Sequence, residues 1–437
     1  MAADAVVAGG SVAGLASALA LASAGRRVLV LDPAGPPPDG PAGKAAGAWH
    51  RPTVPHARHP HTLNSLGVSV LRAHVPDLLD ALVDAGAHLV DMTLTRPGGP
   101  VESDAELVAL SCRRTTFELV LHRLTATTPG VEIRYGTTVR GVQGTSRVTA
   151  AVTDRADSVG TDLLVDATGR RATSRDWLAA TGWRLPPDQV RPSGLRLFSR
   201  FYRRSGPMPP LDRGNAAGVL GSHYACVLHP GDGDTFSISI GVLPEDHKMR
   251  ALSRCTAFTA VATATPGVRA WLHGAEPITP VRAFTFPPNI MRGMANGDTP
   301  GVVPVGDAAC VTNPLYGRGI SLAFAHAFRG LTTPDPSAVY LPWFRLSVDQ
   351  DRDRIAMWRT AVRSGATPPP ADGVWRASRH DPLVWRGLTR VLMGLNEPGQ
   401  VFDEHFHRRV RTVLAGAPPA PATPTRAELV ELVEEAP

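Results

Sequence analysis

Lysine and cysteine are both scarce in this chain of 437 residues. Only Lys44 and Lys248 are lysines, so nearly all of the positive charge is arginine, which is spread along the chain and mixed with acids. A nucleic-acid surface needs clustered basic residues, so we expect no nucleic-acid binding. The four cysteines lie far apart without a C-x-x-C pair. This argues against a structural zinc site and a secreted disulfide framework, and it favours a cytoplasmic protein.

A long, strongly apolar run is also missing. The uncharged stretch from Ala5 to Ala24 is rich in Ala, Gly and Ser, and no basic segment precedes it. We therefore expect neither a membrane span nor a signal peptide. With 43% hydrophobic and 19% charged residues, the composition is that of a globular protein, and the length predicts two or three packed units.

Residues 4–32 follow the order strand, glycine turn, helix, strand, acid. Ala5–Ala8 and Val28–Leu31 are short apolar runs that predict buried parallel strands. Leu15–Ala24, between them, is strongly helix-forming, and Asp32 stands directly after the second strand. This is the context that a dinucleotide-binding fingerprint requires, so we expect a Rossmann-type unit here.

The glycine turn predicts how the phosphates of a dinucleotide would be held. Gly9 permits the sharp turn, the backbone near Gly10 can approach a pyrophosphate, and Gly14 lets helix and strand pack closely. Ser11 stands where the fingerprint has its middle glycine, and serine is the smallest replacement. Asp32 is placed to accept hydrogen bonds from the adenosine ribose hydroxyls.

A second motif lies late in the chain. Gly301–Val305 predicts another buried strand, and a helix is expected from about Ile320 to Phe328. Asp307, between them, offers a carboxylate for the hydroxyls of a ribityl chain. The helix N-terminus after Gly319 would place a positive dipole beside a flavin, which suits the negative charge of the reduced ring.

GGSVAGL near the start and VGDAACVTNPLYGRGIS late in the chain together resemble the FAD-dependent monooxygenase superfamily. That superfamily includes para-hydroxybenzoate hydroxylase, squalene epoxidase and bacterial natural-product tailoring hydroxylases. The segment Arg51–His61 is similar to the R-P-x-V-P-x-x-R-H-x-H sequence of a bacterial subgroup, with His56 where that subgroup usually carries glutamine. The resemblance implies an α/β fold: a Rossmann-type FAD-binding domain, a β-rich substrate domain and a helical C-terminal region.

The resemblance also assigns cofactor contacts. Asp307 would bind the ribityl and pyrophosphate region, and Pro314 with Gly317 would border the flavin ring. No side chain is assigned a catalytic role, because the flavin itself carries the chemistry. The expected cofactor-binding residues are Gly9, Gly10, Ser11, Gly14, Asp32, Arg51, Arg114, Asp307, Pro314, Gly317 and Gly319.

The expected domains are discontinuous. Residues 1–75, 110–185 and 281–335 would form the FAD-binding domain, residues 76–109 and 186–280 the substrate-binding domain, residues 336–415 the C-terminal helices, and residues 416–437 a linker and tail. Alternating apolar segments between about 190 and 290 predict an antiparallel sheet, which by resemblance roofs the flavin. The tail ends in a short acidic helix or a loose segment. Candidate substrate-pocket residues are His61, Phe198, Tyr202, Tyr224 and Phe236, although core packing is the commoner fate of such aromatic residues.

Three further features have competing interpretations. His50, His56, His59 and His61 lie in one segment, but its prolines exclude the helical spacing of a zinc site, so we expect no metal. Many single-component hydroxylases have Asp-Gly where this chain has Thr168-Gly169, and that acid is tied to the handling of NAD(P)H. Either NAD(P)H or a partner flavin reductase therefore supplies electrons. Asp166 is interpreted as a turn residue rather than a catalytic base.

The resemblance implies an oxidoreductase that uses FAD and O₂. Through a flavin C4a-hydroperoxide it would epoxidise or hydroxylate a small apolar polyketide, terpenoid or aromatic metabolite in natural-product biosynthesis. Halogenating relatives carry a W-x-W-x-I-P stretch and a lysine that directs hypohalous acid, and the chain has no such stretch. Two alternatives are an FAD-bound cyclase without redox chemistry and a flavin reductase of prenyl chains.

Overall fold

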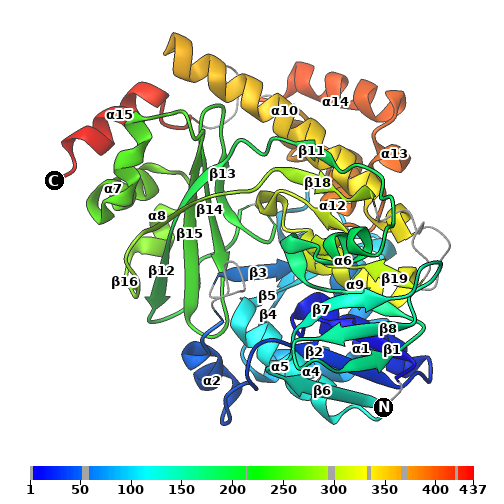
Figure 1. Ribbon diagram of the computed structural model, residues 1–437. Coiled ribbons are helices and arrows are strands. Elements are labelled where there is room, and N and C mark those ends of the chain that lie inside the picture. Colours follow the sequence, from blue (N-terminus) through cyan, green and yellow to red (C-terminus); the bar gives the residue numbers. More distant parts are fainter. Residues whose placement is uncertain are drawn as a thin grey trace.

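The structure is a computed structural model, and a parallel sheet at the lower right of Figure 1 carries the N-terminal motif. It describes residues 3–51, 59–212, 214–293, 301–331, 336–365, 373–418 and 422–437. Within these ranges, no helix is both long enough and apolar enough to cross a membrane.

The parallel sheet has the strand order β19–β10–β1–β2–β6. Its strands are β1 (Ala5–Ala8), β2 (Val28–Asp32), β6 (Val131–Tyr135), β10 (Leu164–Asp166) and β19 (Val302–Pro304). Every residue of β1 and β2 is buried, as expected of strands covered on both faces. All neighbouring strands are parallel, so their carboxyl ends share one edge. The predicted Rossmann-type α/β fold is confirmed.

The two faces of this sheet are covered by different elements. Ala5 and Val7 of β1 pack with residues of helix α1 (Val12–Ser23), whereas Val6 and Ala8 pack with a three-stranded meander. The meander consists of β7 (Val139–Gln143), β8 (Ala150–Thr153) and β9 (Ser158–Gly160). Helix α1 begins directly after the glycine turn, so its first N–H groups face the shared edge of the strands.

A second, antiparallel sheet occupies the region where the alternating pattern predicts one. Its order is β13–β14–β15–β12–β16, with β17 also paired to β12. The strands are β12 (Arg196–Arg204), β13 (Ala217–Leu220), β14 (Ala225–Pro230), β15 (Thr235–Val242), β16 (Ala275–Pro277) and β17 (Arg282–Thr285). One face is packed with large apolar side chains against α7 (Cys255–Ala264), α8 (Arg269–Leu272) and α15 (Arg426–Glu435). The other face is turned toward the rest of the molecule (Figure 1).

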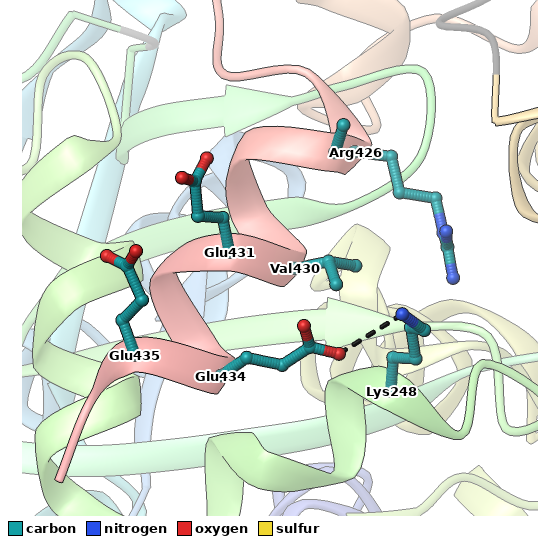
Figure 2. Close-up of a pocket in the computed structure, with 7 residues that line it drawn as sticks. Lys248, Arg426, Val430, Glu431, Glu434 and Glu435 are labelled. Carbon is teal, nitrogen blue, oxygen red and sulfur yellow. Dashed lines mark hydrogen bonds and ion pairs between the residues drawn. The ribbon is translucent and has the colours of Figure 1, made fainter.

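Helix α15 is an ordered part of the β-rich region, so of the two alternatives for the end of the chain the short acidic helix is confirmed and the loose segment is wrong. Leu429 and Val433 are fully buried in the core shared with α7. Arg426 donates two hydrogen bonds to Asp246, and Figure 2 shows Lys248 paired with Glu434 of this helix at 3.1 Å. Thr425 caps the helix by accepting a hydrogen bond from the Glu428 N–H.

Helix α10 (Leu341–Ser364) runs beside the second sheet and beside a small sheet of β11 (Gln189–Arg191), β18 (Asn289–Met291) and β20 (Cys310–Val311) (Figure 1). Its Ile355 and Trp358 pack in one cluster with Leu197 of β12. Another small sheet joins β3 (Pro60–Leu63), β5 (Val108–Arg113) and β4 (His88–Asp91). The remaining C-terminal helices include α12 (Pro382–Leu392) and α14 (Glu404–Gly416).

Candidate functional site

The glycine turn after β1 leaves no room for side chains. A Cβ atom on Gly10 would lie 2.5 Å from Asp32 Oδ2, and one on Gly14 would lie 1.9 Å from the carbonyl oxygen of Gly9. Gly9 has a φ of +113°, which L side chains rarely adopt, and faces the carbonyl of Ala167. The three glycines are therefore required by close backbone approach, as a phosphate cradle needs.

Three charged residues meet at the end of β2 beside this turn. Arg51 Nη1 lies 3.5 Å from Asp32 Oδ2, and Arg51 Nη2 donates a hydrogen bond to Glu118 of α5 (Arg114–Thr127). Their side chains are only 3%, 4% and 1% exposed. Arg114 Nε also lies 3.8 Å from Glu118 Oε2, so two arginines balance two carboxylates here with little help from water. In the described part of the chain, Asp32 Oδ2 accepts no hydrogen bond and Arg51 Nε donates none. A ribose hydroxyl could satisfy such a buried carboxylate oxygen.

Arg114, the first residue of α5, lies beside the first motif. Its Nη2 donates a hydrogen bond of 3.3 Å to the Oγ of Ser11, the N-cap residue of α1. Its charge also acts on Asp307, which follows β19. The Asp307 side chain is exposed, but dense protein surrounds it on its other sides. This enclosure raises the pKa of Asp307, while Arg114, Arg170 and Arg292 act to lower it.

The loop of residues 312–318 leads from β20 into helix α9 (Gly319–Ala325). Pro314 begins a single 3₁₀ turn, and Gly317 ends it with a φ of +64°. A π-helical turn from His326 to Gly330 extends α9, close to the length predicted. Leu315 packs on the cluster that contains Leu197 of the antiparallel sheet. The loop therefore lies between the parallel sheet and the β-rich region.

Helix α10 is hydrogen-bonded to the 312–318 loop through Asp351. Asp351 is fully buried, and its Oδ1 accepts hydrogen bonds from Asn313 Nδ2 at 2.9 Å and from the Tyr316 hydroxyl at 2.8 Å. Arg354 Nη2 donates to the same oxygen, and Asn289 Nδ2 donates to Oδ2 at 2.7 Å. Burial next to Asp351 raises the pKa of Tyr316. These hydrogen bonds to one buried carboxylate hold the loop against α10.

Asp166 is saturated by local hydrogen bonds. Its Oδ1 accepts from the backbone N–H and the hydroxyl of Thr168, and its Oδ2 accepts from the N–H and hydroxyl of Ser174. A carboxylate with four such partners builds a turn and has no lone pair directed at a substrate. The Thr168 hydroxyl also accepts a hydrogen bond from Thr173.

The histidine segment lies only partly within the described residues. Residues 52–58, which include His56, fall outside them. The ring of His59 contacts Phe201 of β12 at 4.9 Å between centroids, and His61 is held in β3 with its Nδ1 2.9 Å from the His59 carbonyl. Across the described ranges, no three His, Cys, Asp or Glu side chains gather as metal ligands would.

The four aromatic pocket candidates of the antiparallel sheet lie in the core. Phe198, Tyr202, Tyr224 and Phe236 are 0 to 2% exposed and pack on the face covered by α7, α8 and α15. Side chains alternate along a strand, so their neighbours point the other way. We call that opposite surface the inner face. It carries Leu197, Ser199 and Phe201 of β12, Ser237, Ser239 and Gly241 of β15, and Ala225, Val227 and His229 of β14.

Comparison with known proteins agrees with this arrangement. No family model matches the chain. Protein Rv3254 of Mycobacterium tuberculosis is 27% identical over 358 residues, which cover 74% of this chain and 71% of that protein.

Solved structures resemble nearly the whole chain. A flavoprotein/dehydrogenase from Cytophaga hutchinsonii has a TM-score of 0.66 at 14% identity and covers 95% of this chain and 100% of its own. PqsL, a probable FAD-dependent monooxygenase from Pseudomonas aeruginosa, has a TM-score of 0.59 at 14% identity, with coverage of 95% and 100%. The myxobacterial FAD-dependent halogenase CndH reaches 0.58 at 17% identity, with coverage of 96% and 98%. The chain has the FAD-dependent monooxygenase and halogenase fold.

Within this monooxygenase–halogenase fold, sequence reasoning missed four residues at the site. Glu118 lies four residues after Arg114, a spacing that places both on one helix face and was a usable signal. Asn313, Arg318 and Asp351 had no such signal, because their contacts join segments that only the fold brings together.

Proposed function

We propose that this chain is an FAD-dependent monooxygenase that oxidises a small apolar metabolite. One observation carries the proposal: Gly306, directly before Asp307 in the second motif, packs against Ala13 of the first motif so closely that a Cβ atom on it would lie 2.9 Å from the Ala13 Cβ. Two motifs at opposite ends of the sequence therefore border one site at the carboxyl edge of the parallel sheet. A plain NAD-binding protein has no need of the second motif.

The residues present fit FAD. Asp32 would bind the adenosine ribose, and the glycine turn with the start of α1 would hold the pyrophosphate. Asp307 would bind the ribityl hydroxyls, and Pro314 with Gly317 would border the ring. When bound and reduced, FAD supplies the activation of O₂. The protein would position the ring through the 312–318 loop and exclude water with the antiparallel sheet.

The placement of the two lysines favours an oxygenase over a halogenase. Lys248 is paired with Glu434 beside α15, on the far side of the antiparallel sheet from its inner face (Figure 2). Lys44 is an exposed residue of a short helix, α2 (Ala42–Ala48). Lys248 is therefore not placed to direct hypohalous acid at the inner face.

The inner face of the antiparallel sheet is our candidate substrate surface. Gly241 and Ala225 are covered by Leu195 and by the cluster that contains Trp358, so the candidate area is the part of this face around Ser199, Ser237 and Ser239. The small side chains of these serines would let a flat, bulky molecule approach the backbone closely. Ser239 donates a hydrogen bond to Ser199, leaving the Ser239 oxygen able to accept another. Burial lowers the pKa of His229, so its ring is neutral at pH 7, and its Nδ1 has no hydrogen-bond partner within the described chain. These groups suit an apolar polyketide, terpenoid or aromatic compound that carries an oxygen substituent.

Oxygen dependence tests the proposal. Purified protein should bind FAD and turn yellow, and with NAD(P)H or an added flavin reductase it should consume O₂ with one member of a panel of polyenes and phenols. Isotopically labelled O₂ should place one labelled atom in the product. Turnover without O₂ and without reductant would instead identify a cyclase, and reductant use without O₂ would identify a prenyl reductase. Protein that binds no FAD would refute all three.

A further inference from the structure

Arg318, the last residue of the 312–318 loop, is a buried cation without a carboxylate partner. It is 1% exposed. Its Nη1 donates to Ser347 Oγ at 3.0 Å and its Nη2 to Gln350 Oε1 at 3.2 Å, and both acceptors are neutral. The guanidinium also lies over the rings of Tyr316 and Trp343, at 5.0 and 5.6 Å. Nowhere in the described ranges does a carboxylate come within ion-pair distance of it.

The charge of Asp351 acts on Arg318 from beyond ion-pair distance, but this carboxylate is already paired with other groups. Asp351 forms its ion pair with Arg354, at 2.8 Å, and accepts its other hydrogen bonds from the loop and from Asn289. Two guanidinium groups against one carboxylate leave this buried cluster with one net positive charge.

Burying an arginine without an acidic partner lowers the stability of the folded protein. A buried charge loses its hydration, and neutral acceptors return only part of that loss. Desolvation lowers the pKa of Arg318 to about 10, so the side chain is still protonated at neutral pH. A leucine or methionine would fill the same space without this penalty. Sequences depart from local rules in this way chiefly at functional sites.

The position of Arg318 indicates what that function is. Its neighbours in the chain are Gly317 and Gly319, which border the flavin ring in our proposed function. Two-electron reduction of the ring with uptake of one proton leaves one negative charge on it; the electrons come from NAD(P)H or a reductase. We propose that Arg318 is a buried positive charge that stabilises this reduced, anionic flavin and so raises its reduction potential. The proposal rests on FAD binding at this site.

A purely structural role makes a different prediction. As an anchor, Arg318 would hold the loop through Ser347 and Gln350, and its loss would loosen the loop without a specific effect on the charged form of the ring. The midpoint potential of the bound flavin distinguishes the two roles, because it responds to nearby charge and can be measured without substrate.

The experiment compares Arg318→Met, Arg318→Gln and Arg318→Lys in FAD-loaded protein by equilibration with a reference dye under anaerobic conditions. We expect loss of the charge to change the ratio of reduced to oxidised flavin by roughly tenfold, the order of magnitude of one unit charge acting at an effective dielectric of about 20. That corresponds to a fall of about 30 mV for the two neutral variants. Arg318→Lys should restore most of the potential. Arg426→Met, which removes the arginine at the first position of α15, is the matched control and should leave the potential unchanged.

Unchanged potentials in both neutral variants would overturn the proposal, and a loss of thermal stability with an unchanged potential would identify an anchor. If neither neutral variant retains FAD while Arg318→Lys does, the midpoint potential of that variant decides: a value near that of the wild type supports a charge role, and a value as low as free FAD overturns it. Arg318→Lys without FAD would also overturn it. Wild-type protein without FAD would refute the proposed function itself, a separate result.

Discussion

Two buried arginines stand at opposite ends of the proposed cofactor site, and their surroundings differ. Arg51, beside the glycine turn, has Asp32 on one side and Glu118 on the other. Arg318, behind the 312–318 loop, has neutral acceptors and aromatic rings. In the proposed function, the end at Arg51 would face the ribose, an uncharged group, and the end at Arg318 would face the ring, whose charge would change in turnover. Charge compensation thus follows the chemistry each end would meet.

A third arginine lies between these extremes. Arg113 at the end of β5 is paired with one carboxylate, Asp232, at 2.6 Å, in the turn between β14 and β15. Thr116 donates to the same carboxylate. This pair joins the helix that carries Arg114 to the antiparallel sheet. The three sites form a series with two, one and no acidic partners, which mutagenesis can test.

Arg51→Met should have the largest effect. It removes the cation between two buried carboxylates, and uncompensated buried charges of this kind cost about 3–5 kcal/mol. Arg318→Met should cause no comparable loss, because it leaves no buried carboxylate unpaired. Urea unfolding of the two FAD-free variants measures the difference. Equal losses of unfolding free energy in the two variants would contradict the difference proposed between Arg51 and Arg318.

Gly14→Ala tests whether FAD binding beside Arg51 depends on the close backbone packing of the glycine turn. The new Cβ would overlap the Gly9 carbonyl, so the turn must move, at a cost of about 1–3 kcal/mol. We expect FAD retention, read from the absorbance of purified protein, to be largely lost. Gly35→Ala is the control, because a Cβ there meets nothing within 4 Å. Normal FAD content in Gly14→Ala would argue against a phosphate cradle at this turn.

Asp232→Asn tests the intermediate member of the series and should lower stability at pH 7 by about 1.5–3 kcal/mol. Burial acts to raise the pKa of Asp232, but the hydrogen bonds and charge of Arg113 outweigh it, so the folded-state pKa is lowered. A carboxyl with a lowered folded pKa stabilises the fold above its unfolded pKa of about 3.9 and loses this contribution as pH falls through the folded value. The gap between wild type and variant should therefore be full at neutral pH and close in strong acid. A gap independent of pH would contradict the ion pair.

Ser11→Gly should have the smallest effect. Ser11 makes no side-chain cap to α1, and glycine at an N-cap costs only a few tenths of a kcal/mol. The variant also restores the middle glycine of the fingerprint. Titration with FAD should give an affinity within about threefold of the wild type. A much larger loss would mean that the bond from Arg114 to Ser11 is essential to FAD binding beside Arg51.

The sequence predicted best the features that are local. The strands β1 and β2, the glycine turn and Asp32 lie within one short stretch, and each is set by neighbours in the chain. The face of β12 that turns inward could not be predicted, because both faces are largely buried and the choice depends on where α7 and α15 pack. The role of Arg318 depends in the same way on α10.

The docking of α15 sets an order for the formation of the β-rich region during synthesis. Leu429 and Val433 complete a core whose other members leave the ribosome long before them. Until residues 426–435 have been made, the part of the α7 and sheet core that α15 covers is exposed to water, and exposed apolar surface promotes aggregation. The antiparallel sheet can therefore reach its final stability only after the cofactor-binding sheet has its last strand, β19.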